Sequence, residues 1–368
     1  MVRIGWREAL AWRVNRHFSG TRTGAEEVAD VAGRLCGLHA QVMGAAELAV
    51  LARVEKLDSS AIHDALWRER SLVKLWAARG TLHLVPAADL PTWLGALSLQ
   101  KKFGNNGHPK VEQICTAVGQ ALRGRMLTRE ELAAEVGRRT GSDELATWVR
   151  SSWGSDLKAA SFRGLICFAP PQGREVRFTA PATWLGETSR PSPPEQALRD
   201  VLRRFLGAYA PATPESIARW WVGPPATAVG KRLLAELGDE VVPVDVNGTT
   251  AWVLAEQVAE LRDASAPPTY RLLPAFDPWV MGALRQPPFL PAEHVRDVFR
   301  PQGWVSPVVL VDGRVVGRWE HRVAGRSVTL AVIPFGTLPR RVRTELEHEA
   351  ERIASYLGGP LSLTWRRA

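Results

Sequence analysis

The sequence has no long hydrophobic run and only three cysteines. No apolar stretch in its 368 residues approaches the roughly 20 residues that a membrane-spanning helix needs. The segment Met1 to Trp6 has no apolar signal core behind it. Cys36, Cys115 and Cys167 are far apart and odd in number, which indicates neither a disulfide framework nor a zinc cluster. We therefore expect a cytoplasmic protein with three buried thiols, no bound metal and no contact with a membrane.

The short motifs of several large enzyme classes are also absent. The sequence contains no Walker A, G-x-G-x-x-G, H-E-x-x-H or G-x-S-x-G pattern. This argues against a nucleotide-binding protein, a zinc peptidase and a serine hydrolase. We expect no cofactor and no bound nucleotide.

The chain does carry a surplus of positive charge, with a formal net charge of +9. Its hydrophobic share of 45% and charged share of 23% are those of an ordinary folded protein, long enough for two or three domains. Such a surplus favours a polyanionic partner. The alternative is an arginine-rich composition inherited from a GC-rich genome, and charge alone does not separate the two interpretations.

Three segments share one pattern of residues at a helix start. Each begins with a threonine, a good helix N-cap: Thr23, Thr128 and Thr213. Glu26 and Glu131 lie three residues after the first two threonines and complete capping boxes. Pro214 occupies the first helical position of the third segment, where a missing N–H costs nothing.

Each of these starts lies in a similar order of predicted elements. A helix precedes it, over Trp6 to Phe18, Val111 to Leu122, or Glu195 to Tyr209. Helical stretches follow it, over Ala46 to Val54 and Ile62 to Glu69, Leu145 to Ala160, or Thr227 to Leu237. A hairpin closes it, from Leu72 to Val85, Gly164 to Thr179, or Glu240 to Leu254. The Asn247-Gly248 turn of the last hairpin is a strong signal of that structure.

Three helices followed by a hairpin is the element order of a winged helix, and three tandem copies favour a nucleic-acid partner. Winged helices also serve as dimerisation or protein-docking modules. After Ala266-Pro267-Pro268 the pattern changes to short strands with one helix, over Leu338 to Leu357. We predict an α+β, mostly helical chain with winged helices over 1–108, 109–190 and 191–266, and a small, mostly β domain over 267–368.

The segment Gly37-Leu-His-Ala-Gln41 places two polar side chains in an apolar run. A polar group buried without a partner costs roughly 1–3 kcal/mol, so the pair needs a partner or a function. Holding a water for hydrolysis is one such function. The alternative is a structural histidine with a satisfied hydrogen bond at the end of an apolar helix.

Together with four other stretches, this motif resembles the tandem winged-helix DNA glycosylases of the AlkZ-like type. The other stretches are Arg79-Gly-Thr-Leu-His-Leu-Val85, Trp220-Trp221, Leu272-Leu-Pro-Ala-Phe-Asp277 and Gly303-Trp-Val-Ser-Pro-Val-Val-Leu-Val-Asp-Gly-Arg-Val-Val-Gly-Arg-Trp319. The resemblance runs from near the N-terminus to the last strand. It implies three winged helices and a C-terminal β-barrel around a DNA channel. It also implies excision of bulky N7-alkylated purines or crosslinks from duplex DNA in a bacterial nucleoid.

The resemblance assigns catalysis to a short motif that falls here on His39-Ala40-Gln41. In the azinomycin-type self-resistance branch the motif is Gln-apolar-Gln, so Gln41 matches and His39 departs from it. This looks like the histidine variant that protects producers of other DNA-alkylating natural products, such as pluramycin-type or trioxacarcin-type compounds. No lysine lies in the motif, so we expect a monofunctional glycosylase without lyase chemistry.

The residue types of the motif suit a labile bond. An N7-alkylguanine is cationic, so its glycosidic bond is already weakened and needs little protonation. Gln41 has donor and acceptor atoms but takes no proton near neutral pH, so it would orient the attacking water. His39 would orient the water or act as general base. A bulky adduct does not fit a tight base-flipping pocket, so we expect an open cleft.

Three further residues are candidates for active-site support. Arg79 and His83 lie in one motif, and His83 either braces the fold or acts directly. Asp277 precedes a proline and is either an Asx-type turn former or an ionised wall of the site. Trp76 and Trp93 are core or lesion contacts, which the sequence does not separate.

Basic residues at element ends are candidates for DNA contact. They are Lys101, Lys102, Arg314, Arg318, Arg322, Arg340 and Arg341. Lys101 and Lys102 close a helix, where cations also complement the helix dipole. Arg340 and Arg341 lie at a helix start, the wrong end for the dipole, which favours a phosphate partner. The arginines of the Asp312-Gly313 hairpin either probe a groove or belong to a solvated edge.

We expect a monomeric enzyme that binds double-stranded DNA carrying a bulky alkylated guanine. Two other classes stay open at this point. A non-catalytic DNA-binding regulator fits the tandem winged helices and the charge, but has no use for the polar pair of the motif. A drug-sequestering protein would need an apolar, aromatic pocket and would not depend on DNA.

Overall fold

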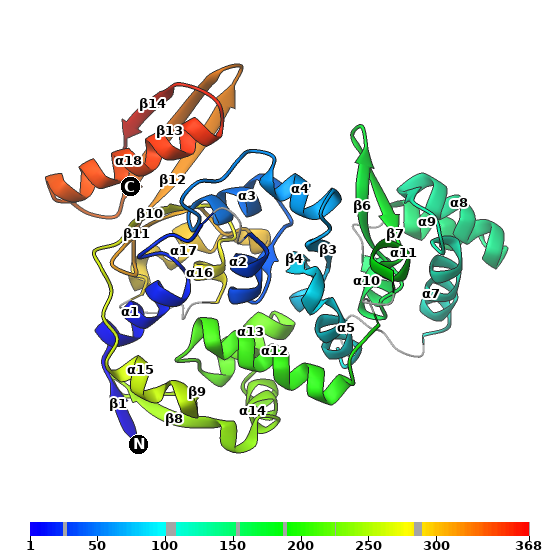
Figure 1. Cartoon of the computed structure of the whole chain (residues 1–368), viewed down its shortest axis with the longest axis horizontal. Helices are drawn as coiled ribbons and strands as arrows, with labels where there is room; N and C mark the ends of the chain where they lie inside the picture. The colour runs from blue at the N-terminus through cyan, green and yellow to red at the C-terminus, as the bar shows by residue number, and fades with distance from the viewer. Residues whose placement is uncertain are drawn as a thin grey trace. The chain divides into compact units, whose positions relative to one another are not determined.

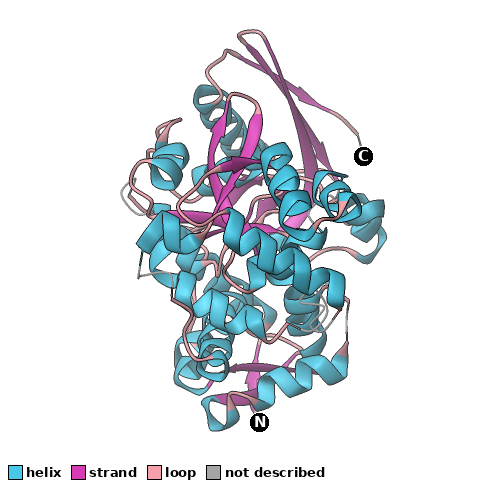
Figure 2. Cartoon of the chain, turned by 90° about the vertical axis from the view of Figure 1, so that its right-hand side faces the viewer, coloured by secondary structure: helices cyan, strands magenta, loops and turns pink. Residues whose placement is uncertain are grey.

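The computed structural model describes residues 1–24, 28–100, 108–151, 155–186, 190–224, 226–282 and 289–367. Its contacts group into two compact units. The first comprises residues 1–62, 203–220 and 225–368, and the second comprises residues 63–202 and 221–224. Helices form most of the regular structure, and the strands form small sheets (Figures 1 and 2). This confirms the mixed helix-and-strand class, whereas the winged helices and the four segment boundaries stay predictions.

The second unit contains two of the predicted hairpins. Its elements are α4 (Ala61–Trp67), β3 (Leu72–Trp76), β4 (Leu82–Pro86), α5 (Leu90–Ser98), α7 (Pro109–Ala121), β5 (Leu127–Thr128), α8 (Arg129–Thr140), α9 (Asp143–Ser151), α10 (Ser155–Phe162), β6 (Cys167–Gln172), β7 (Glu175–Thr179) and α11 (Pro181–Leu185), and α12 (Pro194–Tyr209) begins in it. Strands β3 and β4 pair antiparallel, as do β6 and β7, and β5 pairs with β7. Both hairpins lie where the sequence predicts them.

Two of the three predicted threonine N-caps lie at helix starts in the described part of the chain. The Thr128 side chain accepts a hydrogen bond from the Glu131 backbone N–H, and the Glu131 carboxylate accepts one from the Thr128 backbone N–H. This is the predicted capping box. Thr213 accepts a hydrogen bond from the Ser216 N–H, with Pro214 at the first helical position of α13. The box predicted for Thr23 depends on Glu26, which lies outside the described residues.

The first unit combines the N-terminus with the third predicted segment. Its elements here are β1 (Val2–Ile4), α1 (Trp6–Arg16), α2 (Val28–Arg34), β2 (Leu38–His39), α3 (Met43–Leu51), α13 (Pro214–Val222), α14 (Thr227–Ala235), β8 (Val241–Val246), β9 (Thr249–Leu254) and α15 (Val258–Arg262). Strand β1 pairs with β8 in parallel, and β8 pairs with β9 antiparallel. Asn247 and Gly248 have φ of 49° and 86°, which is the backbone that a two-residue hairpin turn requires.

The C-terminal part of the first unit is a five-stranded sheet with helices on it. Its elements are β10 (Tyr270–Leu273), α16 (Pro278–Met281), α17 (Val295–Val298), β11 (Val308–Val311), β12 (Arg314–Ala324), β13 (Ser327–Pro334), α18 (Arg340–Tyr356) and β14 (Leu361–Trp365). The strand order is β10-β11-β12-β13-β14, antiparallel except for the last pair. In Figure 1, α18 lies beside the long β12–β13 ladder.

The prediction of a closed C-terminal β-barrel is wrong, because the strands form an open sheet. Across the described residues, β10 and β14 are the two edges of an open sheet and do not pair with each other. The physical reason is that α18 covers one face of the sheet and buries its apolar side chains there. Leu346, Ala350 and Ile353 of α18 pack with Trp319 and Leu330 of the sheet. The helix predicted over Leu338 to Leu357 is found as α18, but the prediction of a single helix is wrong, because the short helices α16 and α17 also lie in this region.

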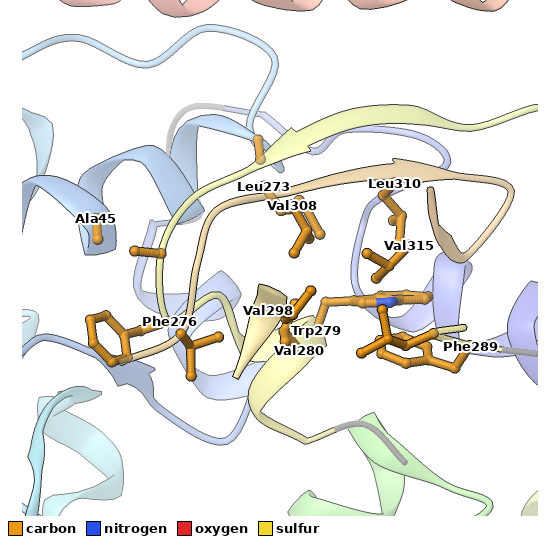
Figure 3. Close-up of a cluster of buried hydrophobic side chains, with 14 of the residues drawn as sticks. Ala45, Leu273, Phe276, Trp279, Val280, Phe289, Val298, Val308, Leu310 and Val315 are labelled. Atoms are coloured by element: carbon orange, nitrogen blue, oxygen red, sulfur yellow. The ribbon is translucent and has the colours of Figure 1, made fainter. Parts of the chain in front are cut away.

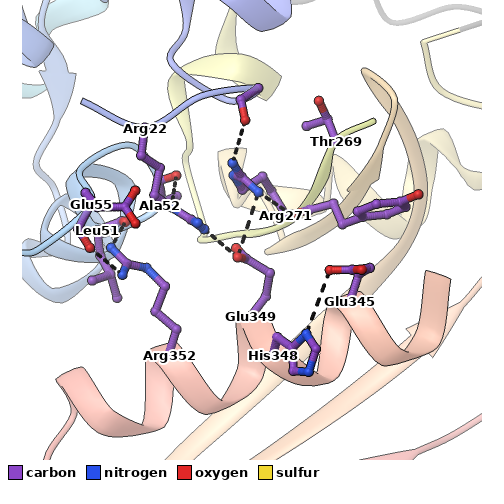
Figure 4. A network of polar contacts seen from close by, with 12 residues as sticks. Arg22, Leu51, Ala52, Glu55, Thr269, Arg271, Glu345, His348, Glu349 and Arg352 are labelled. Atoms are coloured by element: carbon purple, nitrogen blue, oxygen red, sulfur yellow. Dashed lines mark hydrogen bonds and ion pairs between the residues drawn. The ribbon is translucent and has the colours of Figure 1, made fainter. Parts of the chain in front are cut away.

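Salt bridges and carbonyl contacts attach α18 to the rest of the first unit. Figure 4 shows Glu349 of α18 between Arg22 and Arg271, and the Arg271 Nη1–Glu349 Oε1 distance is 3.8 Å. Arg352 donates to the Leu51 carbonyl at 3.1 Å and to the Glu55 carbonyl at 2.6 Å. These carbonyls lie at the end of α3, so α18 holds the C-terminus of the helix that follows the catalytic candidates.

A second apolar cluster lies beneath the loop that follows β10. Figure 3 shows Ala45 and Phe276 on one side of it and Trp279 with Phe289 on the other. The Trp279 and Phe289 rings stack with centroids 6.2 Å apart. Because Trp279 is fully buried, α16 is anchored firmly behind Phe276. Within the described part of the chain, no helix is both long and apolar enough to cross a membrane.

We predict opposite effects of one substitution at two helical glycines of the first unit. A Cβ on Gly230 in α14 would lie 1.8 Å from the Pro214 carbonyl oxygen of α13, so Gly230→Ala should cost about 1–3 kcal/mol of unfolding free energy. A Cβ on Gly207 in α12 meets nothing closer than 3.8 Å, so Gly207→Ala should be neutral or stabilising by up to about 1 kcal/mol. Urea denaturation of both variants checks this, and equal effects would contradict the close approach of α13 and α14.

Candidate active site

The motif His39-Ala40-Gln41 lies between α2 and α3 of the first unit. After α2, Cys36 and Gly37 have φ of 54° and 89° and turn the chain into the two-residue strand β2. His39 and Ala40 are buried, whereas Gln41 is exposed. The expected helix end is therefore corrected to a strand end, because the turn at Gly37 breaks the helical backbone. The motif leads from the interior to the surface within three residues.

His39 is held by an aromatic contact from a distant part of the chain. The residue is 7% exposed, and its ring stacks on Phe276 with centroids 4.7 Å apart and an interplanar angle of 20°. Phe276 in turn meets Trp304 edge to face at 5.0 Å. We call these three rings the aromatic row. Stacking fixes the plane of the His39 imidazole, which a catalytic group needs.

A buried ion pair fixes the backbone next to Phe276. Arg53 donates to both carboxylate oxygens of Asp277, from Nη2 to Oδ1 at 2.7 Å and from Nη1 to Oδ2 at 2.8 Å. Both side chains are completely buried. The Asp277 Oδ1 also accepts the Trp279 N–H at 2.8 Å and so caps α16. Of the two interpretations of Asp277, the structure shows the turn and cap former, directly after the ring that stacks on His39.

Arg79 and His83 lie in the second unit, in and after the turn of the β3–β4 hairpin. Arg79 has a φ of 60°, a left-handed backbone that is uncommon for arginine. His83 is buried, contacts the Thr81 carbonyl at 2.9 Å through Nδ1, and stacks near Trp93. Burial, and then the charge of Arg79, lower the pKa of His83 to about 3. A direct acid–base role near neutral pH does not fit such a group, whereas bracing does.

The basic candidates differ in their surroundings. Arg314, Arg322, Arg340 and Arg341 are exposed, the first two on β12 and the others in the first turn of α18. Arg318 is half-buried and paired with Glu320, Nη1 to Oε1 at 2.7 Å. Lys101 and Lys102 lie outside the described residues. The four exposed arginines are thus accessible for phosphate contact.

A cavity of about 400 Å³ opens beside the motif within the first unit. Val42 and Gly44, directly after Gln41, form one wall, and Trp304 of the aromatic row forms another. Sequence reasoning missed Phe276, Trp304 and Arg53 as site residues. The signal for the first two was present, because both lie in stretches that carry the family resemblance. Arg53 gave no local signal.

The structure also shows where the two tryptophan candidates and the three cysteines lie. Trp76 and Trp93 are buried in the second unit, so they belong to its core. Cys36, Cys115 and Cys167 are buried thiols, as predicted, and burial raises the pKa of Cys115 to about 11. In the part of the chain that the structure describes, no group of three or more His, Cys, Asp or Glu side chains forms a metal site.

Comparison with known proteins gives consistent matches. The sequence model of the family described as "DNA glycosylase AlkZ-like" matches residues 32–356. A curated protein of Streptomyces sahachiroi, named interstrand DNA cross-link repair glycosylase, is 36% identical over 372 residues, covering 97% of this chain and 98% of that protein. The solved structure of the Streptomyces sahachiroi DNA glycosylase AlkZ superposes with a TM-score of 0.87 at 33% identity and full coverage of both chains.

We predict that Asp277→Ala destabilises the protein by about 3–5 kcal/mol, because it leaves the Arg53 guanidinium buried without its partner. Urea denaturation measures the loss. The control is the double variant Arg53→Met with Asp277→Leu, which removes both charges and should recover much of the stability. Equal losses in the single and double variants would mean that the unpaired charge is not the cause.

We predict that His83 makes stability fall in mild acid. Its pKa is about 3 in the folded chain and near 6.5 when unfolded, so the unfolded state binds more protons between these values. The stability contribution is complete above pH 6.5 and declines by up to about 1.4 kcal/mol per pH unit below it. His83→Asn keeps a donor for the Thr81 carbonyl and should flatten the decline between pH 7 and pH 5.

Thermal unfolding at several pH values measures this decline. His63→Asn, at an exposed histidine of α4, is the matched control. An unchanged pH dependence in His83→Asn would show that another group causes the acid sensitivity.

Proposed function

Because the chain belongs to the AlkZ-like DNA glycosylases, we propose that it excises bulky N7-alkylguanine adducts from double-stranded DNA. The chain is a DNA N-glycosylase, and DNA is its partner. The observation that supports the finer proposal is the motif itself: His39 is stacked in a fixed plane, and Gln41 is exposed two residues later. A buried imidazole and an exposed amide therefore lie two residues apart at one strand end, with no carboxylate between them in the motif.

The proposed reaction is attack of water on C1′ of the damaged nucleotide. The water oxygen bonds to C1′, the C1′–N9 bond breaks, and its electron pair neutralises the positive charge of the N7-alkylated purine. Gln41 orients the water, since its amide both donates and accepts hydrogen bonds. The attacking water passes one proton to bulk solvent, and the products are the free alkylated base and an abasic site.

We assign His39 mainly to water orientation. The leaving base is already cationic, so it departs without protonation, and the water proton is lost as the C1′–O bond completes. A neutral imidazole offers one acceptor nitrogen and one N–H, which suffices to hold a water. The proposed biological role is repair of lesions made by alkylating natural products, including self-resistance of a producer. The proposed working form is a monomer.

The test is release of the modified base from duplex DNA that carries a bulky N7-guanine adduct. We predict that His39→Ala and Gln41→Ala each lower the single-turnover rate by about 10²-fold or more, in line with loss of a positioned catalytic group. DNA affinity should persist in both variants, because phosphate contacts dominate it. His39→Gln should retain more activity than His39→Ala, since glutamine holds a water but takes no proton.

Each other outcome has a defined meaning. Equal loss in His39→Gln and His39→Ala would assign the proton transfer to His39 as general base. Tight binding by the wild type with no release from several such adducts would contradict the proposed substrate and favour a regulator or a drug-sequestering protein.

A further inference from the structure

The cavity beside the motif is larger than removal of a small alkyl group requires. Its volume of about 400 Å³ falls in the range of roughly 300–1,000 Å³ that is typical of sites for drug-sized ligands. One wall continues directly from the motif, because Val42 follows Gln41 and Gly44 lies in the first turn of α3. The cavity therefore begins at the residue that follows Gln41 in the chain.

We propose that this cavity binds the appendage of the lesion, a flat polycyclic group with oxygen substituents attached to guanine N7. This inference rests on the proposed function and adds a binding subsite to it. The catalytic motif acts on the bond between base and sugar, while the cavity holds the part of the adduct that lies away from that bond.

The aromatic row shows how the two parts of the site connect. Phe276 lies between the rings of His39 and Trp304, in contact with both. Trp304 lines the cavity and is 43% exposed, although a large apolar side chain is stabilised by burial. A planar group stacked on Trp304 would cover this ring. Because Trp304 is one ring further from the motif than Phe276, that planar group is the distal part of a substrate.

The backbone supports a positioned role for these rings. Phe276 itself has a φ of 57°, and Gln302, two residues before Trp304, has a φ of 60°. Left-handed backbone at non-glycine residues costs energy and persists where the surrounding structure enforces it. The Arg300 N–H donates to the Trp304 carbonyl at 2.9 Å and closes the turn that carries Trp304. Both rings are thus held by strained, hydrogen-bonded turns.

The remaining walls define the chemistry of the ligand. Ala45, Leu48 and Trp319 are buried apolar side chains that face the cavity. Arg300, Arg318 and His321 bring hydrogen-bond donors to the same cavity, and Glu320 holds the Arg318 guanidinium in place. An apolar floor with several donors suits fused rings that carry carbonyl or hydroxyl oxygens.

The experiment compares two substrates on one duplex sequence. One duplex carries N7-methylguanine, and the other carries the N7-guanine adduct of aflatoxin B1 epoxide, a flat polycyclic group rich in oxygen. The measured quantity is the ratio of kcat/KM for the polycyclic adduct to kcat/KM for the methyl adduct. We predict that Trp304→Ala lowers this ratio at least about tenfold, the effect of losing one stacking ring, and that Trp304→Phe restores most of it.

A second variant approaches the cavity from the other wall. A Cβ on Gly44 meets no atom within 4 Å, so Gly44→Leu should fill the cavity without disturbing the fold. It should lower the same ratio. Trp148→Ala, the same truncation on α9 of the second unit, is the matched control and should leave the ratio within about twofold.

The outcomes separate the subsite from the proposed reaction. Parallel loss on both substrates, or no loss, in Trp304→Ala and Gly44→Leu would overturn the subsite while leaving the glycosylase proposal intact. If the wild type releases neither base, the proposed reaction fails, and the subsite is judged by binding. Wild-type protein should then prefer the aflatoxin duplex over the unmodified duplex, and Trp304→Ala should abolish that preference; equal affinities in the wild type would overturn it.

Discussion

The geometry of the candidate site depends on the buried ion pair of Arg53 and Asp277. Neither side chain has any exposed surface, and the two oxygens of the carboxylate face the two terminal nitrogens of the guanidinium. Burial of two charges has a large desolvation cost, so such a pair specifies a geometry more than it adds stability. Here the geometry joins the end of α3 to the residue after Phe276. The helix that follows the motif and the ring that stacks on His39 are thereby fixed to one another.

Strained backbone marks the same stretches that carry the family resemblance. Cys36, Arg79, Phe276, Gln302 and Asp312 all have positive φ, and each lies within or next to one of these stretches. These five left-handed residues cost several kcal/mol together if each costs roughly 1–3 kcal/mol. Such strained backbone persists where the surrounding structure holds a side chain in one direction. In the first unit, Phe276 stacks on His39, and the turn at Gln302 carries Trp304, which lines the cavity beside the motif.

The sequence predicted the structures that depend on residues close together in the chain, such as helix caps and hairpin turns. Thr128 and Glu131 are three residues apart, and Asn247-Gly248 forms its turn without outside help, so both were predictable. The Arg53–Asp277 pair spans 224 positions, and no pattern within either segment indicates its partner. The prediction of a closed C-terminal barrel failed for a related reason. Closure depends on whether the edge strands β10 and β14 pair, and the packing of α18 on the sheet, which is not local to either strand, affects this. The motif residues were found because they are polar side chains in an apolar stretch of sequence. Phe276 is an apolar side chain in an apolar stretch, so nothing marks it as a site residue.

The electrostatics of the first unit favour a cationic leaving group. Asp277 is the carboxylate next to Phe276, but Arg53 neutralises it, and its oxygens also cap α16. It therefore offers no net negative charge to stabilise positive charge on the sugar. Glu320 lines the cavity, yet it pairs with Arg318 and lies 3.6 Å from Arg366. With these carboxylates committed, bond breaking in the proposed reaction must draw on the charge of the substrate itself. Under the proposed reaction an unmodified base, which carries no such charge, is a poor substrate.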